Sequence, residues 1–186
     1  MKRLALLVCL VVMLSGCRGT SDAMGECLAF RDKLLNSNGC SFQTEITADY
    51  GDAIHLFSMD ITADSQGNVD FSIIGPESIS QITGSISQPG AALTFDEVAL
   101  AFPLLADGQL SPVASPWIFL KTLRSGYITS VCREGTLLHM TIDDSYADDA
   151  LTLDIWIDDA QLPVHAQVLY REKSILSLSV KNFHLL

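Results

Sequence analysis

The sequence LTLDIWIDDAQLPVHAQVLY, residues 151–170, decides the fold class of this chain. Apolar residues occupy every second position before Asp158-Asp159, and the same alternation resumes after that acidic pair. The side chains of a strand point to opposite faces in turn, so this period predicts two antiparallel strands with one apolar and one polar face. The alternating residues are Leu151, Leu153, Ile155, Ile157, Leu162, Val164, Ala166, Val168 and Tyr170.

The alternation extends from this hairpin in both directions. Strands at 127–131 and 137–142 are expected to pair across Arg133-Glu134-Gly135, and a last strand carries Leu176, Leu178 and Val180. Turn signals such as Tyr50-Gly51-Asp52 separate further short strands, which gives about ten strands in all and an antiparallel sheet. The earlier strands are predicted at 42–48, 57–63, 69–73, 79–86, 92–95 and 98–102.

An N-terminal segment, residues 22–36, has helical spacing. Thr20 or Ser21 can cap it, and Asn38-Gly39 can end it. Its apolar face is expected to hold Met24, Cys27, Leu28, Arg31, Leu34 and Leu35.

A second helix is predicted inside the break at residues 103–126. Ser115 is expected to cap it, with Pro116 at its first position and Gly126 at its end. A sheet with one apolar face needs a cover, and only these two helices are available. The sequence therefore predicts one α+β domain: a strongly curved antiparallel sheet, an incomplete β-barrel, whose concave face is covered by the N-terminal helix and the inserted mid-chain helix.

The first residues, MKRLALLVCLVVMLSGC (1–17), have the pattern of an export signal followed by a cysteine. Lys2 and Arg3 precede an apolar run from Leu4 to Leu14 that is too short to span a bilayer. Leu14-Ser15-Gly16-Cys17 resembles the lipobox of bacterial lipoproteins. The resemblance implies a signal peptide at 1–16, a lipidated Cys17 with a short tether at 17–21, and one domain at 22–186. Acyl chains on Cys17, palmitate among them, would hold this domain on the extracytoplasmic face of the cell membrane; the alternative is an ordinary secretory signal.

Composition restricts the function classes. The chain has 11 Lys and Arg against 22 Asp and Glu, a formal net charge of −11, which argues against a nucleic-acid partner. Hydrophobic residues make up 48% and charged residues 18%, which excludes general disorder. Nucleotide-binding and catalytic-triad motifs are absent from the sequence, so we expect neither a cofactor nor an enzyme.

The cysteines left after export are Cys27, Cys40 and Cys132. They allow at most one internal disulfide, with three pairings, or three free thiols. They form no Cys-x-x-Cys pair, so neither a redox motif nor a zinc knuckle is indicated.

Other metal-ligating residues are expected to have ordinary positions. An acidic segment includes Asp143, Asp144, Asp148 and Asp149, which fit solvated hairpin tips better than a weak calcium site. The histidines fall on separate predicted strands, and their spacing predicts no metal site. They are His55, His139, His165 and His184.

The order of elements resembles the outer-membrane lipoprotein carrier superfamily, the LolA/LolB-like fold. The motifs behind this resemblance are Phe71-Ser72-Ile73 to Pro76-Glu77-Ser78-Ile79, Leu93-Thr94-Phe95-Asp96, and Leu162-Pro163-Val164 to Val180-Lys181-Asn182-Phe183. Ala48-Asp49-Tyr50-Gly51-Asp52 and Leu123-Arg124-Ser125-Gly126-Tyr127 look like segments of Firmicutes lipoproteins. The resemblance covers residues 22–186 and implies an incomplete barrel with helices plugging its mouth around an apolar cavity.

That cavity would bind or transfer a hydrophobic or amphiphilic ligand, a lipid or a lipoprotein, without chemistry. Its expected lining comes from the inserted helix and the inward positions of the strands. The lining residues are Trp117, Phe119, Leu120, Leu123, Phe57, Met59, Phe71, Ile73, Ile155 and Ile157. The alternative is a docking or regulatory lipoprotein with a filled core and a membrane-protein partner, as the germination-type lipoproteins suggest.

Overall fold

The computed structural model describes residues 19–49, 51, 53–87, 90–95, 98–101, 105–106, 109–147 and 150–186. Within them, eleven strands form one antiparallel sheet, and β7 and β8 form a small second sheet. The large sheet has the order β6-β5-β4-β3-β2-β1-β13-β12-β11-β10-β9, so each strand lies beside its neighbour in sequence except at β1 and β13. The predicted fold class and curved antiparallel sheet are confirmed.

The strand bounds follow the predicted alternation closely. They are β1 (Gly39–Asp49), β2 (Ile54–Asp64), β3 (Val69–Gly75), β4 (Thr83–Ser87), β5 (Gly90–Phe95), β6 (Val98–Ala101), β7 (Leu105–Ala106), β8 (Gln109–Leu110), β9 (Tyr127–Glu134), β10 (Leu137–Asp143), β11 (Leu151–Ile157), β12 (Pro163–Tyr170) and β13 (Lys173–Leu185). Two short 3-10 helices, η1 (Glu77–Ile79) and η2 (Pro112–Ala114), lie between them. The strand expected at 79–86 therefore begins only at Thr83.

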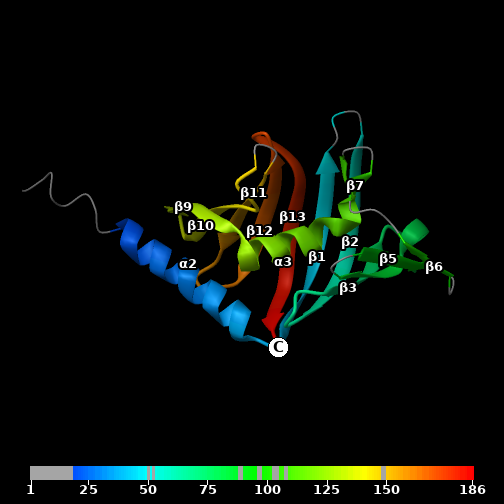
Figure 1. The fold of residues 1–186 in the computed structure, drawn as a ribbon, viewed down its shortest axis with the longest axis horizontal. Coiled ribbons are helices and arrows are strands. Elements are labelled where there is room, and N and C mark those ends of the chain that lie inside the picture. Colours follow the sequence, from blue (N-terminus) through cyan, green and yellow to red (C-terminus); the bar gives the residue numbers. More distant parts are fainter. Residues whose placement is uncertain are drawn as a thin grey trace, which may run out of the picture.

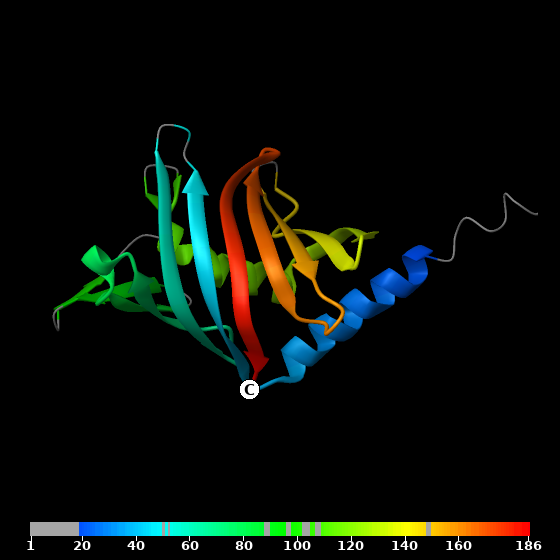
Figure 2. The ribbon, with the colours of Figure 1, turned by 180° about the vertical axis from the view of Figure 1, so that it is seen from behind.

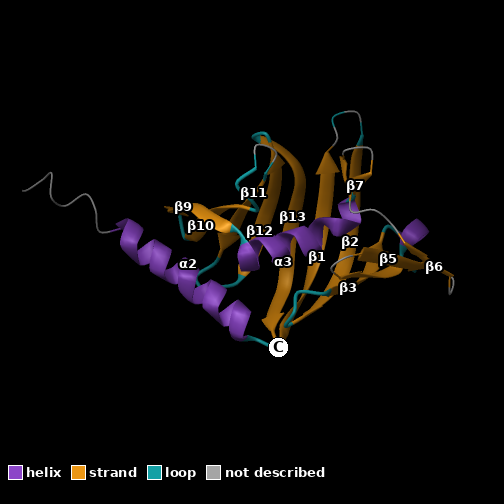
Figure 3. Ribbon diagram, viewed as in Figure 1, coloured by secondary structure: helices purple, strands orange, loops and turns teal. Residues whose placement is uncertain are grey.

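Two helices cover one side of the sheet. The mid-chain helix α3 (Ser115–Ser125) crosses the central strands, and the N-terminal helix α2 (Gly19–Asn36) runs along the end formed by β9 and β10 (Figure 1). Seen from behind, the long strands hide most of α3, while α2 projects past the sheet (Figure 2). Figure 3, coloured by secondary structure, distinguishes the two helices from the curved sheet that they cover.

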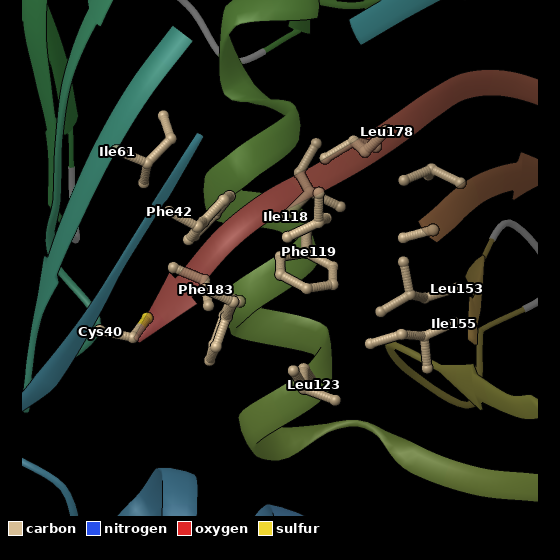
Figure 4. Close-up of a cluster of buried hydrophobic side chains, with 14 of the residues drawn as sticks. Cys40, Phe42, Ile61, Ile118, Phe119, Leu123, Leu153, Ile155, Leu178 and Phe183 are labelled. Carbon is tan, nitrogen blue, oxygen red and sulfur yellow. The ribbon is translucent and has the colours of Figure 1, made fainter. Parts of the chain in front are cut away.

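Aromatic rings connect both helices to the two central strands. Phe119 of α3 meets Phe42 of β1 edge-on at 5.8 Å between ring centroids, and Phe42 stacks on Phe183 of β13 at 5.5 Å (Figure 4). Phe183 in turn lies 6.5 Å from Phe30 of α2. All four rings are at most 3% exposed. Such pairs contribute about 0.5–1.5 kcal/mol beyond the burial of their area, so this aromatic row fixes where the helices sit.

The buried face of α2 differs from the predicted one. Ala23, Cys27, Phe30 and Leu34 point into the core, whereas Leu28 is 51% exposed and Leu35 45% exposed. Apolar residues lie on both sides of this helix, so their spacing alone does not predict which side is buried. The buried side is the one that packs against the sheet. The helix also begins at Gly19, earlier than the expected start near Asp22.

The ends of α3 also differ from the prediction in detail. Ser115 is the first helical residue rather than the cap, and its hydroxyl donates a hydrogen bond of 2.6 Å to the Pro112 carbonyl. Gly126 does end the helix, in an extended conformation, and its N–H donates to the Thr122 carbonyl at 2.8 Å. From the other side, Arg31 Nη1 donates to the Gly126 carbonyl at 3.0 Å, which ties α2 to the junction of α3 and β9.

Phe119→Ala is expected to destabilise the protein by about 3–5 kcal/mol, because the ring is fully buried and its loss leaves a cavity. Urea unfolding followed by far-UV circular dichroism measures this. Ser87→Ala, at an exposed strand position, serves as the control and should change the unfolding free energy by less than about 0.5 kcal/mol. A Phe119→Ala variant as stable as the control would contradict the assignment of this ring to the core.

Gly126→Ala is expected to destabilise the α3–β9 junction. A Cβ there would lie 2.6 Å from Ile142 Cγ2 and 2.7 Å from the carbonyl oxygens of Asp143 and Thr122. At Gly25 on α2, a Cβ would meet nothing within 4 Å, so Gly25→Ala should stabilise the helix by about 0.5–1 kcal/mol. Opposite shifts in melting temperature for the two variants are predicted; equal shifts would refute this packing.

Candidate functional site

The predicted lining residues converge on one interior. Four of them, Trp117, Phe119, Leu120 and Leu123, come from α3, and the other six come from β2, β3 and β11. Trp117 is half-buried and packs against this cluster from its edge. The remaining nine belong to one packed core and are 9% exposed or less: Phe57, Met59, Phe71, Ile73, Phe119, Leu120, Leu123, Ile155 and Ile157. The structure thus brings the set together, with the described side chains packed against one another.

A hollow with basic side chains lies beside Trp117. It has a volume of about 200 Å³ and is lined by Gln66, Gly67, Asn68, Trp117, Lys121, Arg124 and Ser125. Lys121 Nζ stands 5.2 Å from the centroid of the Trp117 ring, and Arg124 Nη2 donates to the Ser65 carbonyl at 2.6 Å. We call this the basic hollow; it lies where the outer side of α3 meets the β2–β3 turn.

Asp64 builds the turn that forms one wall of the basic hollow. Its Oδ1 accepts hydrogen bonds from the backbone N–H groups of Gln66 at 2.8 Å and Asn68 at 2.9 Å. The Asn68 side-chain amide donates to Oδ2 at 2.7 Å. Partial burial raises the pKa of Asp64, but these hydrogen bonds to the carboxylate together outweigh it and lower the pKa below its ordinary value. The wall is therefore an ordered turn held by an ionised carboxylate.

A second hollow, of about 330 Å³, lies between α2 and the turn that joins β11 to β12. Its lining is Glu26, Phe30, Arg133, Leu138, Ile157, Asp158, Asp159 and Gln161. Arg133 Nη2 pairs with Glu26 Oε2 at 2.6 Å, and Asp158 Oδ1 accepts the Leu162 N–H at 2.9 Å. Because carboxylates surround its one arginine, this acidic hollow is poorly suited to an anionic ligand.

The described acidic residues at the end of the β10–β11 hairpin accept hydrogen bonds from within that hairpin. Asp143 Oδ1 accepts a hydrogen bond from Thr152 Oγ1 at 2.8 Å, and Asp144 Oδ1 accepts the Leu151 N–H at 2.9 Å. Asp148 and Asp149 lie outside the described residues. These bonds agree with the interpretation of hairpin ends; the weak calcium site, the less favoured alternative, is untested.

The three cysteines carry free thiols. Burial raises the pKa of Cys27 to about 11 and that of Cys40 to about 11. Cys132 is exposed on β9. For these three described cysteines, the structure therefore shows the alternative of three free thiols and no disulfide.

The expected lipidation site, Cys17, lies outside the described residues, and so do the predicted signal peptide and Arg18 of the tether. The rest of the predicted tether, Gly19 to Ser21, forms the first turn of α2 instead. Lipidation therefore stays a prediction. Among the described residues, no helix combines the length and apolarity needed to cross a bilayer.

Sequence reasoning did not anticipate the basic hollow. Lys121 and Arg124 are three apart on a helix, which places them on one face. Nothing in the sequence indicates that this face meets the turn at 65–68, whose strands are far from α3 along the chain. Only the crossing of α3 over the sheet brings the two together.

No protein-family model and no curated protein matches this sequence. Solved structures with a similar arrangement include an uncharacterized conserved protein from Thermus thermophilus, with 13% identity, a TM-score of 0.48, and coverage of 88% of this chain and 87% of that one. A LolA superfamily protein from Nitrosomonas europaea has 9% identity and a TM-score of 0.44, and the match covers 86% of this chain and 93% of that one. The Mycobacterium tuberculosis lipoprotein LppX has 12% identity and a TM-score of 0.44, and the match covers 88% of this chain and 95% of that one.

One of these neighbours is a LolA superfamily protein, the superfamily that the sequence resembles. The likeness concerns the arrangement of the elements. The resemblance to Firmicutes lipoproteins stays a prediction.

Cys132 is expected to react with iodoacetamide at pH 8 in the native protein, whereas Cys27 and Cys40 should react only after unfolding. Both of these thiols are buried, and at a pKa of about 11 only about one in a thousand is ionised at that pH. Peptide mass spectrometry with and without guanidinium checks this. Rapid native labelling of Cys27 or Cys40 would contradict the described packing.

Proposed function

We propose that this protein is a lipid-anchored binding protein on the extracytoplasmic face of the cell membrane. Cys17 carries the anchor, and the ligand is an amphiphile with an anionic head group. One observation carries the proposal: Trp117 packs against the edge of the apolar interior under α3 and also lines the basic hollow. A binding site for an amphiphile needs such a border between apolar and polar surface.

The apolar part of the ligand would lie between α3 and the sheet. The described side chains there are packed, so the ligand's chain enters only if α3 and the strands move apart. Burial of the ligand's own apolar surface offsets that cost at about 25 cal/mol per Å². The driving force is apolar burial, and no chemical step is involved.

The head group would lie in the basic hollow. Lys121, Arg124 and the amide of Asn68 supply hydrogen-bond donors there, and two of them are cationic. These cations stand out in a chain with 11 basic and 22 acidic residues. Hydrogen bonds from a cation to an anionic head group are about twice as strong as neutral ones, so they favour an acidic amphiphile over a neutral one.

The second candidate is a docking or regulatory lipoprotein that binds a membrane protein. It is favoured by the packing of the predicted lining, since Phe119, Leu123 and Ile155 are 0% exposed. A filled interior provides a rigid support for a docking surface and needs no opening step.

Native mass spectrometry of the full chain, purified from the membranes of its host in mild detergent, separates the two candidates. A bound lipid beyond the anchor supports the amphiphile proposal. Protein that is consistently empty, and that stays so after incubation with phosphatidylglycerol micelles, contradicts it and leaves the docking candidate.

Lys121→Gln is expected to weaken binding of phosphatidylglycerol about tenfold, the loss of one charge-assisted hydrogen bond of about 1.5 kcal/mol. Lys181→Gln is the matched control, because Lys181 is exposed and pairs with Glu45 on strands β13 and β1, away from the basic hollow. Titration with a fluorescent analogue measures both variants. Equal affinities of the Lys121→Gln and Lys181→Gln variants would show that the head group does not bind in the basic hollow.

A further inference from the structure

The β9–β10 hairpin brings three metal-ligating side chains to the convex face of the sheet. Cys132 and His139 are direct cross-strand partners, and Glu134 lies two residues beyond Cys132 on the same face. Their neighbours Val131, Leu138 and Met140 point into the core. Because strand side chains alternate, the three polar residues face away from α3 and lie outside both hollows.

The three ligand atoms lie close together. His139 Nδ1 is 3.7 Å from Cys132 Sγ and 2.9 Å from Glu134 Oε1, and all three atoms are within 4.8 Å of one another. Around a tetrahedral zinc ion, bond lengths of 2.0–2.3 Å put sulfur and nitrogen about 3.6 Å apart, and nitrogen and oxygen about 3.4 Å apart. Small side-chain rotations therefore convert the observed arrangement into a coordination shell.

Trp156 of β11 holds two of these side chains in place. Its ring stacks on His139 with 4.5 Å between centroids and an interplanar angle of 2°. Its Nε1–H donates to Glu134 Oε2 at 2.8 Å, which leaves Oε1 facing the histidine. The orientation of imidazole and carboxylate is therefore set before any ligand binds, which lowers the entropy cost of binding.

Asp154 of β11 lies on the far side of the imidazole. Its Oδ1 is 3.1 Å from His139 Nε2 and accepts a hydrogen bond from Thr141 Oγ1 at 2.7 Å. The Nε2 atom is buried and has no well-aligned hydrogen bond. Once Nδ1 gives its lone pair to a metal, the carboxylate of Asp154 beside Nε2 favours the ring proton on that nitrogen.

We propose that Cys132, Glu134 and His139 bind a thiophilic divalent cation, with Zn²⁺ as the best match. Thiolate, imidazole and carboxylate together suit zinc, whereas Mg²⁺ and Ca²⁺ require oxygen ligands throughout. On binding, the Cys132 thiol releases its proton to solvent, Nδ1 donates its lone pair, and Nε2 keeps its proton. Three protein ligands leave a fourth position open to water.

The proposal is tested on the full chain, reduced with a phosphine and titrated with ZnCl₂ against a chelator. We expect one zinc equivalent whose affinity falls at least about tenfold in Cys132→Ser and in His139→Ala, and less in Glu134→Gln. His184→Ala, which removes an exposed histidine on β13, is the matched control and should bind as the native chain does.

Cobalt provides a second readout that does not depend on affinity. Co²⁺ bound by the native chain should give a thiolate-to-cobalt charge-transfer band, and Cys132→Ser should lose it while keeping its circular dichroism spectrum. Zinc affinity unchanged in Cys132→Ser and His139→Ala, or no zinc bound at micromolar concentrations, would overturn the site. In that case the 2.9 Å contact of His139 and Glu134 is a local side-chain contact only. Neither outcome bears on the amphiphile site, which lies on the other side of the sheet.

Discussion

The apolar face of the curved sheet has to be covered, and its burial beneath α3 is the constraint on which the rest of this structure depends. Strands that alternate apolar and polar residues expose a continuous apolar surface until a second layer packs on it. Phe119 provides the centre of that layer, in contact with Phe42, which stacks on Phe183. Phe183 extends the same packing to Phe30, so the position of α2 depends on it too.

The core also determines what the outer face of the sheet can do. Leu138 and Met140 are anchored inside, and this forces His139 between them to point outward. The same holds for Trp156 between Ile155 and Ile157 on the neighbouring strand. His139 and Trp156 therefore stack because both inner rows are fixed. A proposed binding function inside and a proposed cation site outside can thus coexist on one sheet without sharing a side chain.

Arginines connect the elements of this acidic chain. Arg31 joins α2 to the end of α3, Arg124 joins α3 to the β2–β3 turn, and Arg133 joins β9 to Glu26 of α2. Burial lowers the pKa of Arg31, but its planar guanidinium still donates to a carbonyl across the interface. The helix cover is thus attached at its ends by directional bonds as well as by apolar packing, and the basic hollow is a by-product of one of these attachments.

The sequence by itself determined the α+β class, most strands, the paired hairpin at 127–142 and the existence of both helices. These features follow from short periods and turn residues, which depend on neighbours along the chain. The tertiary structure decided which face of α2 is buried, with Phe30 inside and Leu28 exposed, and that Ser115 begins α3 rather than capping it. It also decided that Lys121 and Asn68 line one hollow and that Asp154 and Trp156 flank His139. Such contacts join residues distant in sequence, and they arise only when the sheet curves and α3 packs across it.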